Sequence, residues 1–213
     1  MKESMNFINH KYETIIQDNG DTRDKLRQLQ EENGSMQSKI DDLTSRVNQL
    51  EQNSRMTNIE IQCMPEKKDE NLLNLVIELG KTINCNISED NLAHYTRIAK
   101  LKKDSVRPRS IIVQFNSSKK RDQYLAAAIK YNKLNPNDKL NSSHAGLPGP
   151  KSPIFICEHL SATNKALHAA ARQAAKDKGY KYVWVRSGRV YMRKTEHSEY
   201  KIIRNINSLN NLP

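Results

Sequence analysis

The apolar residues of this chain change their spacing near Asn58. Upstream, an apolar residue recurs every three or four positions, which is typical of a helix with one apolar stripe. Downstream, apolar residues come in short blocks that indicate strands and helices. The switch predicts a helical arm followed by folded α+β domains.

The excess positive charge lies downstream of the same point. Up to Met56 the chain holds 8 Lys and Arg against 10 Asp and Glu, which leaves 27 of the 35 bases and 14 of the 24 acids for the rest. A formal net charge of +11 predicts an acidic partner, with nucleic acid ahead of an anionic membrane surface.

Cysteine usage and hydropathy indicate the compartment. The three cysteines, Cys63, Cys85 and Cys157, stand far apart, which favours buried thiols in a reducing environment over a disulfide framework. No apolar run has the length of a bilayer span, and the N-terminus lacks the apolar core of a secretory signal. We expect an intracellular protein, cytoplasmic or nuclear, without membrane insertion.

Residues 1–56 are predicted to form a coiled-coil oligomerisation arm. Seven of eight seam positions over four heptads are apolar, the eight being Leu26, Leu29, Asn33, Met36, Ile40, Leu43, Val47 and Leu50. Ile or Val at a with Leu at d favours a dimer, and a trimer stays open. Asn19-Gly20 interrupts the helical rhythm upstream, and the alternative is a single helix folded against the rest of the chain.

Residues 57–135 follow the order β-α-β-β-α, with room for a fourth strand. This is the ferredoxin-like layout shared by RNA-recognition domains. Strands are expected at 59–63, 95–99 and 110–115, and helices from about Glu70 and from Ser117 or Ser118. The third strand offers Phe115 as its one aromatic residue and the first strand offers none, so we do not expect base stacking on this sheet.

Basic residues gather at two places in this domain. Six cations face one acid, Asp104, in and beside the loop joining the second and third strands, and this favours phosphate binding over a merely solvated loop. A second group begins the next helix, where backbone N–H groups also attract anions. The two groups are Arg97, Lys100, Lys102, Lys103, Arg107 and Arg109, and then Lys119, Lys120 and Arg121.

Residues 136–152 are rich in Pro, Gly, Asn and Ser and are predicted to be a flexible linker. Residues 153–213 then predict a small α+β domain with a strand at 154–156. Ser161 is expected to cap an alanine-rich helix that Gly179 ends. This helix carries an outward basic row that we expect to bind nucleic acid: Lys165, Arg172 and Lys176.

A β-hairpin is the best single candidate site. Residues 182–186 and 189–193 alternate strictly on either side of Ser187-Gly188, which predicts a two-residue turn. Valines and a methionine form the core face. The outward face joins rings that stack on bases to guanidinium groups that bind phosphates: Tyr182, Trp184, Arg186, Arg189, Tyr191 and Arg193. The alternative is that arginines cover aromatic pairs and stabilise the hairpin without a ligand.

Catalytic signatures are missing from the sequence. It has no Gly-rich phosphate loop and no zinc-ligand spacing. Cys157 and His159 share one strand face without a third partner, which favours a buried thiol and an ordinary histidine over a nucleophile with its base. We expect no enzymatic activity, no cofactor and no metal.

Four local motifs and the order of elements carry a family resemblance from about residue 24 to 209. The motifs are NIEIQCMPE (58–66), RIAK (97–100), RPRSIIVQF (107–115) and FICEHLS (155–161). The chain resembles the first-open-reading-frame RNA-binding proteins of LINE-type retrotransposons. Its C-terminal part also resembles the baculovirus few-polyhedra (FP) protein family and its insect relatives.

This resemblance implies a homotrimeric coiled coil and cooperative single-stranded nucleic-acid binding with strand annealing. Arg97, Arg107 and Arg109 match the family's RNA-contacting loop. We therefore predict an α+β, non-catalytic, self-associating protein that binds single-stranded RNA or DNA, possessing nucleic-acid chaperone activity. The competing hypothesis is a structural or assembly protein, viral or scaffold, that acts through its coiled coil.

Overall fold

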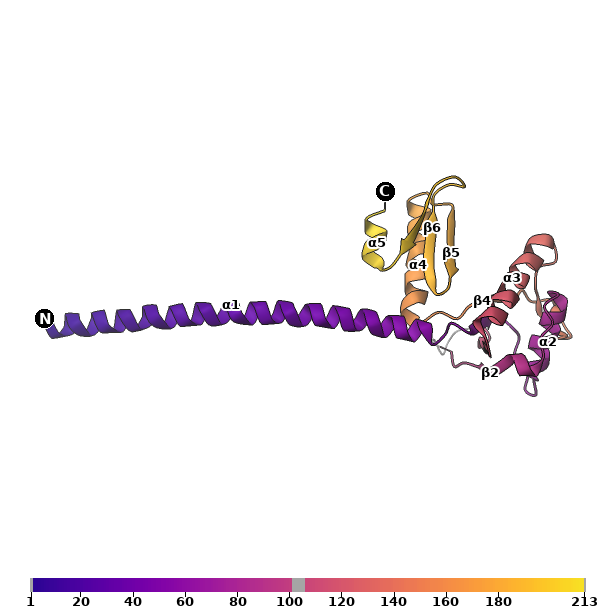
Figure 1. Cartoon of the computed structure of the whole chain (residues 1–213), viewed down its shortest axis with the longest axis horizontal. Coiled ribbons are helices and arrows are strands. Elements are labelled where there is room, and N and C mark those ends of the chain that lie inside the picture. Colours follow the sequence, from indigo (N-terminus) through magenta and orange to yellow (C-terminus); the bar gives the residue numbers. More distant parts are fainter. Residues whose placement is uncertain (1, 101–105, 213) are drawn as a thin grey trace. The chain divides into compact units, whose positions relative to one another are not determined.

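The computed structural model describes residues 2–100 and 106–212, which divide into a helical unit, Met1–Gln49, and a larger compact unit, Leu50–Pro213. The larger unit contains two antiparallel sheets, one of four strands and one of three (Figure 1). The predicted α+β class is confirmed.

Helix α1 spans Lys2–Asn53 as one continuous α-helix. The interruption expected at Asn19-Gly20 does not occur, because Gly20 and Gly34 both lie inside the helix. A glycine in a helix interior costs about 1 kcal/mol relative to alanine, which weakens a long helix without ending it.

The first sheet has the ferredoxin-like order β2-β3-β1-β4. Its strands are β1 (Asn58–Gln62), β2 (Leu92–Arg97), β3 (Ile111–Phe115) and β4 (Phe155–Glu158). Helices α2 (Leu72–Thr82) and α3 (Ser118–Leu134) bury Leu79 and Tyr124 against β1 and β3, and a short 3₁₀ helix, η1 (Glu89–Asn91), precedes β2. Ser117 caps α3 as expected, accepting a hydrogen bond from the N–H of Lys120.

Strand β4 belongs to this first sheet, whereas the sequence placed it in the C-terminal domain. It pairs antiparallel with β1, Ile59 opposite Glu158 and Ile61 opposite Ile156. Both β1 residues are fully buried, so the edge of β1 needs backbone partners that water cannot supply. The chain returns almost a hundred residues later to provide them.

Residues 136–152 pack onto the first sheet's core, although the sequence predicted a flexible linker. Leu140 and Ala145 are buried in the core that the sheet shares with α2 and α3. A short 3₁₀ helix, η2 (Ser142–Ala145), is capped by the side chain of Asn141, and Asn141 forms a β-bridge with Pro153. This segment, rich in proline and glycine, is therefore an ordered connection that packs against the core.

The second sheet has the order β5-β6-β7 and one helix-covered face. It consists of β5 (Tyr182–Arg186), β6 (Arg189–Arg193) and β7 (Tyr200–Ile203). Helix α4 (Ala162–Asp177) buries its alanine-rich stripe against Val190 and Met192, and α5 (Ile206–Asn210) completes this core. Figure 1 shows α4 alongside the β5–β6 hairpin. Ser161 caps α4 as predicted, whereas β7 and α5 had not been predicted.

No helix within residues 2–100 or 106–212 has both the length and the apolar character needed to cross a bilayer.

Candidate nucleic-acid interface

The β5–β6 hairpin has the predicted register. Tyr182 pairs with Arg193, Trp184 with Tyr191, and Arg186 with Arg189. Ser187 and Gly188 have φ angles of +50° and +72°. Positive φ at both central residues defines a type I′ turn, whose twist matches that of the two strands.

Three rings from three different strands meet on the outward face of this sheet. Trp184 and Tyr191 are stacked, with centroids 5.5 Å apart and planes 11° apart. Tyr200 of β7 stands edge-on to both, at 5.6 Å from Tyr191 and 6.4 Å from Trp184. We call the outward residues of β5 and β6, together with Tyr200, the aromatic face.

The arginines of the aromatic face have no acidic partner in the described part of the chain. No salt bridge there involves Arg186, Arg189 or Arg193, and the first two are exposed. Arg193 places its Cζ atom 4.8 Å from the centroid of the Tyr182 ring. The arrangement in which an arginine covers a ring is therefore present at Arg193, while Arg186 and Arg189 leave their charge to solvent.

A carboxylate from the first sheet holds the hairpin turn. The backbone N–H groups of Ser187 and Gly188 donate to the two oxygens of Glu158, at 2.8 and 2.7 Å. The guanidinium of Arg121 lies 3.7 Å from the same carboxylate and is buried. Glu158 thus joins the end of β4 to the turn between β5 and β6.

Gln52, in the last turn of α1, holds the start of α4 next to this turn. Its Oε1 atom accepts hydrogen bonds from the N–H of Ser161 (2.9 Å) and from Asn164 Nδ2 (3.0 Å). A Cβ atom on Gly188 would stand 2.5 Å from Gln52 Cγ, closer than real Cβ contacts allow. Glycine is therefore required here both for its φ angle and for the space taken by Gln52.

The C-terminal part of the chain is similar to a known family. Residues 161–213 match the family model described as baculovirus FP protein domain 2. A search of curated proteins finds no match to the chain. The predicted resemblance to FP proteins is supported for this segment, and the one to LINE-type proteins stays a prediction.

The FP-like segment begins at the cap of α4, directly after β4. That start agrees with the assignment of β4 to the first sheet. The segment contains the whole aromatic face, including Tyr200. Sequence reasoning missed Tyr200 because 200–203 is short and lacks a clear alternation of apolar and polar residues.

Two arginines in and beside the loop between β2 and β3, Arg97 and Arg109, form ion pairs within the fold. Arg97 has a buried side chain and forms an ion pair with Glu70, with its Nη2 atom 2.7 Å from Glu70 Oε2. It also donates to the carbonyl oxygens of Met64 (3.1 Å) and Pro65 (2.9 Å). Arg97 therefore ties β2 to the segment after β1, and we leave it out of the interface.

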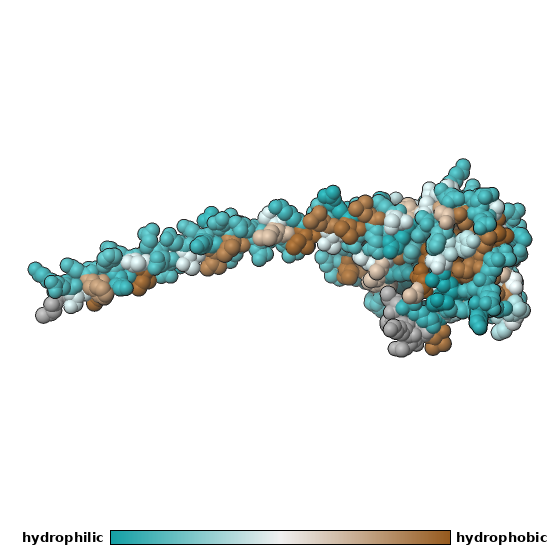
Figure 2. All heavy atoms as spheres, turned by 90° about the horizontal axis from the view of Figure 1, so that it is seen from below, coloured by the Kyte–Doolittle hydropathy of each residue, from teal (hydrophilic) through white to brown (hydrophobic). Residues whose placement is uncertain are grey.

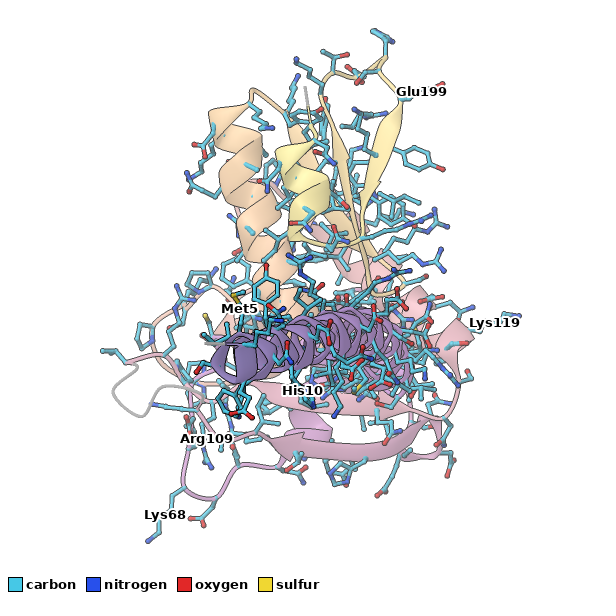
Figure 3. The ribbon with its side chains drawn as sticks, turned by 90° about the vertical axis from the view of Figure 1, so that its left-hand side faces the viewer. Met5, His10, Lys68, Arg109, Lys119 and Glu199 are labelled. Atoms are coloured by element: carbon cyan, nitrogen blue, oxygen red, sulfur yellow. The ribbon has the colours of Figure 1, made fainter. Side chains whose placement is uncertain are left out.

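Arg109 is paired but remains half exposed (Figure 3). Its backbone N–H and its Nε atom donate to Glu66 at 2.6 and 2.8 Å, and the backbone hydrogen bond is the main cause that lowers the pKa of Glu66. Lys100 and Arg107 are exposed. Lys102 and Lys103 lie outside the described residues.

The basic start of α3 divides between surface and interior. Lys119 points into solvent (Figure 3), and Lys120 donates through Nζ to the carbonyl of Asn86 at 3.0 Å. Arg121 is 2% exposed and engages Asp122 and Glu158. It supports the hairpin junction from inside, so it is not a ligand-binding residue in our interpretation.

The basic row of α4 lies on the other side of the second sheet from the aromatic face. Lys165 pairs with the buried carboxylate of Glu60 on β1, at 2.8 Å. Arg172 and Lys176 are exposed. Because α4 covers the core side of the hairpin, these two side chains do not share a surface with Trp184.

Cys157 and His159 take separate hydrogen-bond partners. The Cys157 thiol donates to the carbonyl of Glu60 at 3.5 Å, and burial raises its pKa to about 12. His159 Nδ1 lies 3.2 Å from Asn58 Nδ2, and burial lowers its pKa. A thiol neutral at physiological pH is a poor nucleophile. Within the described ranges, no three His, Cys, Asp or Glu residues gather in a way that could hold a metal ion.

Proposed function

We propose that this protein is a non-catalytic, self-associating binder of single-stranded nucleic acid that uses the aromatic face as its contact surface. The observation that carries the proposal is the meeting of three rings with arginines that no described acid neutralises. We expect it to act in the cytoplasm or the nucleus, where such a ligand is found.

The chemistry of this face favours single strands over duplexes. Tyr and Trp rings stack on unpaired bases of any sequence, whereas a duplex hides those faces within its own stack. Guanidinium groups bind phosphate oxygens in a fork. Arg186 and Arg189 stand directly opposite each other beside the turn, so they present two such groups together.

The exposed seam of α1 supports self-association. Its apolar residues, among them Leu26, Leu29 and Leu43, are more than half exposed in the single chain. Figure 2 shows apolar patches that recur along the helix between hydrophilic stretches. A second or third copy would bury this seam, at about 25 cal/mol per Å² of apolar surface. Several linked binding faces would then gain avidity on one strand.

The match to FP domain 2 supports a viral relationship for the C-terminal segment. The proposal includes a relationship to mobile elements and a strand-annealing, chaperone-like activity. Strand annealing requires that several copies coat one strand without reading its sequence, which stacking and phosphate contacts allow.

A salt titration of the full-length protein on single-stranded and duplex RNA tests the proposal. We expect log affinity for the single strand to fall with log salt by about 0.7 for each phosphate neutralised. Duplex RNA of equal length should bind more weakly once its phosphate density is accounted for. Binding that does not depend on salt, or equal affinity for single-stranded and duplex RNA, contradicts the proposal.

The second candidate is an assembly protein acting through the same seam. The exposure of Leu29 and Leu43 favours it equally. Leu29→Lys with Leu43→Lys should disperse the oligomer in sedimentation equilibrium. If function in cells is lost with this pair and survives neutralisation of the hairpin arginines, the assembly hypothesis replaces nucleic-acid binding.

A further inference from the structure

An open hollow of about 480 Å³ lies on the aromatic face beside β5. Its volume is within the range of small-molecule sites in proteins. The residues that line it come from the start of the hairpin and from β7: Lys181, Tyr182, Val183, Trp184, Arg193 and Tyr200.

The spacing of its walls suits one planar ring. Tyr182 and Trp184 point to the same side of β5, so their attachment points are about 6.6 Å apart along the strand. Bases in a stacked strand lie about 3.4 Å apart, so this spacing leaves room for one base on Trp184 beside Tyr182. Tyr200, edge-on to Trp184 at 6.4 Å, limits the hollow on the side of β7.

The charge of the hollow decides between ligand classes. Aromatic pockets of this kind also bind quaternary ammonium groups. Here Lys181 Nζ lies 5.4 Å from the centroid of the Tyr182 ring, and Arg193 Cζ lies 4.8 Å from it. The lining contains these two cations and no acid, so a cationic ligand is repelled and a flat ring that carries a phosphate is attracted.

We propose that this hollow binds one nucleotide of the single strand, with the base on Trp184 between Tyr182 and Tyr200. Lys181 and Arg193 hold the adjoining phosphate. This inference rests on the proposed function and refines it. It adds Lys181 to the interface and assigns Tyr200 a position beside one bound base.

Trp184 is the single tryptophan of the chain, so its fluorescence reports on the hollow directly. The full-length protein is titrated with an oligouridylate of eight nucleotides and with an abasic strand of the same length, while a dye on each strand reports total binding. We expect the oligouridylate to quench Trp184 emission as it binds. The abasic strand should bind more weakly and leave the emission unchanged.

Variants at β7 provide the second arm. Stacking on one aromatic residue changes affinity by about fivefold to a hundredfold, so Tyr200→Ala, which removes a ring that bounds the base without stacking on it, should weaken oligouridylate binding by about fivefold, the lower end of that range. Tyr200→Phe should restore it, because the ring is retained. Ile202→Ala is the matched control, since Ile202 lies two residues along the same strand and pairs with Tyr191. Tyr200 is 60% exposed, and circular dichroism checks that its variant is folded.

The outcomes separate the two proposals. Salt-dependent binding without Trp184 quenching, equal quenching by the abasic strand, or wild-type affinity in Tyr200→Ala overturns the nucleotide seat while the proposed function stands. Absence of salt-dependent binding to any single strand overturns both.

Discussion

The loop between β2 and β3 and the aromatic face of the hairpin are both rich in arginine, and the fold uses the two sets differently. In the loop, Arg97 and Arg109 meet Glu70 and Glu66, which arrive from the segment after β1. On the hairpin, Arg186 and Arg189 meet no described acid. The sequence prediction counted only the acids within the loop. It therefore overestimated the positive charge available to a ligand, because the neutralising carboxylates come from elsewhere in the chain.

Arg97→Met tests the loop side of this contrast and should have the largest effect. The change leaves the carboxylate of Glu70, itself 13% exposed, without its partner. Removing one member of a buried pair costs about 3–5 kcal/mol. We expect the free energy of unfolding in urea to fall by that amount.

Arg109→Gln is the control for Arg97→Met, because the Arg109–Glu66 pair is partly exposed. Such pairs contribute less than about 1 kcal/mol. If Arg97→Met is as stable as wild type but binds RNA with a flatter salt dependence, Arg97 is a ligand contact and the contrast is broken.

Neutralising the hairpin arginines tests the other side. In Arg186→Gln/Arg189→Gln/Arg193→Gln, we expect the log–log salt slope to shrink by about 2 and affinity at 0.1 M salt to fall about a hundredfold, since each phosphate contact contributes about 0.7. Filter binding on single-stranded RNA measures both. Unfolding in urea should change little, because these side chains have no salt bridge to lose within the described residues and the contact of Arg193 with the Tyr182 ring contributes only about 0.5–1 kcal/mol.

The pair Arg172→Gln/Lys176→Gln removes two exposed charges from α4, on the other side of the sheet. If filter binding shows that the affinity for single-stranded RNA falls less per charge removed here than on the hairpin, the result supports the aromatic face as the interface. A larger loss of affinity per charge would place the interface on α4 and not on the aromatic face.

Gly188→Ala tests whether the turn that presents these arginines depends on its surroundings. A non-glycine residue at positive φ costs about 1–2 kcal/mol, and Gly188→Ala adds a clash with Gln52. Gly179→Ala is the matched control, since Gly179 has φ of +70° and nothing within 4 Å of the added Cβ. We expect thermal unfolding to show the larger loss for Gly188→Ala. Equal losses would mean that the side chain of Gln52 moves aside without cost.

The pH dependence of stability should give the smallest effect. Burial lowers the pKa of His159, and burial with Arg172 nearby lowers that of His168. The unfolded chain therefore takes up protons at higher pH than the folded chain, so stability declines as pH falls below the ordinary value of 6.5. His159→Gln/His168→Gln should flatten the unfolding free energy measured between about pH 7 and pH 5. An unchanged slope contradicts this origin.

Local patterns predicted the hairpin fully, because its register depends on the turn residues and on strict alternation between neighbouring strands. Long-range pairing was beyond reach. The partner of β4 is β1, and the proline-rich segment before β4 suggested a boundary that the buried Leu140 contradicts. Tyr200 was not predicted for a similar reason. It joins the aromatic face through a third strand, β7, whose own sequence shows no clear strand pattern.

Glu158 has a consequence for how the C-terminal segment can be moved between proteins. The recognisable family segment begins at 161, yet the carboxylate that holds its hairpin turn belongs to residue 158, and Gln52 lies further upstream still. The segment that matches the family model and the set of residues that hold its hairpin turn therefore have different borders. A graft that starts at 161 exchanges these supports for water, whereas a graft that starts before β4 carries the turn's anion with it.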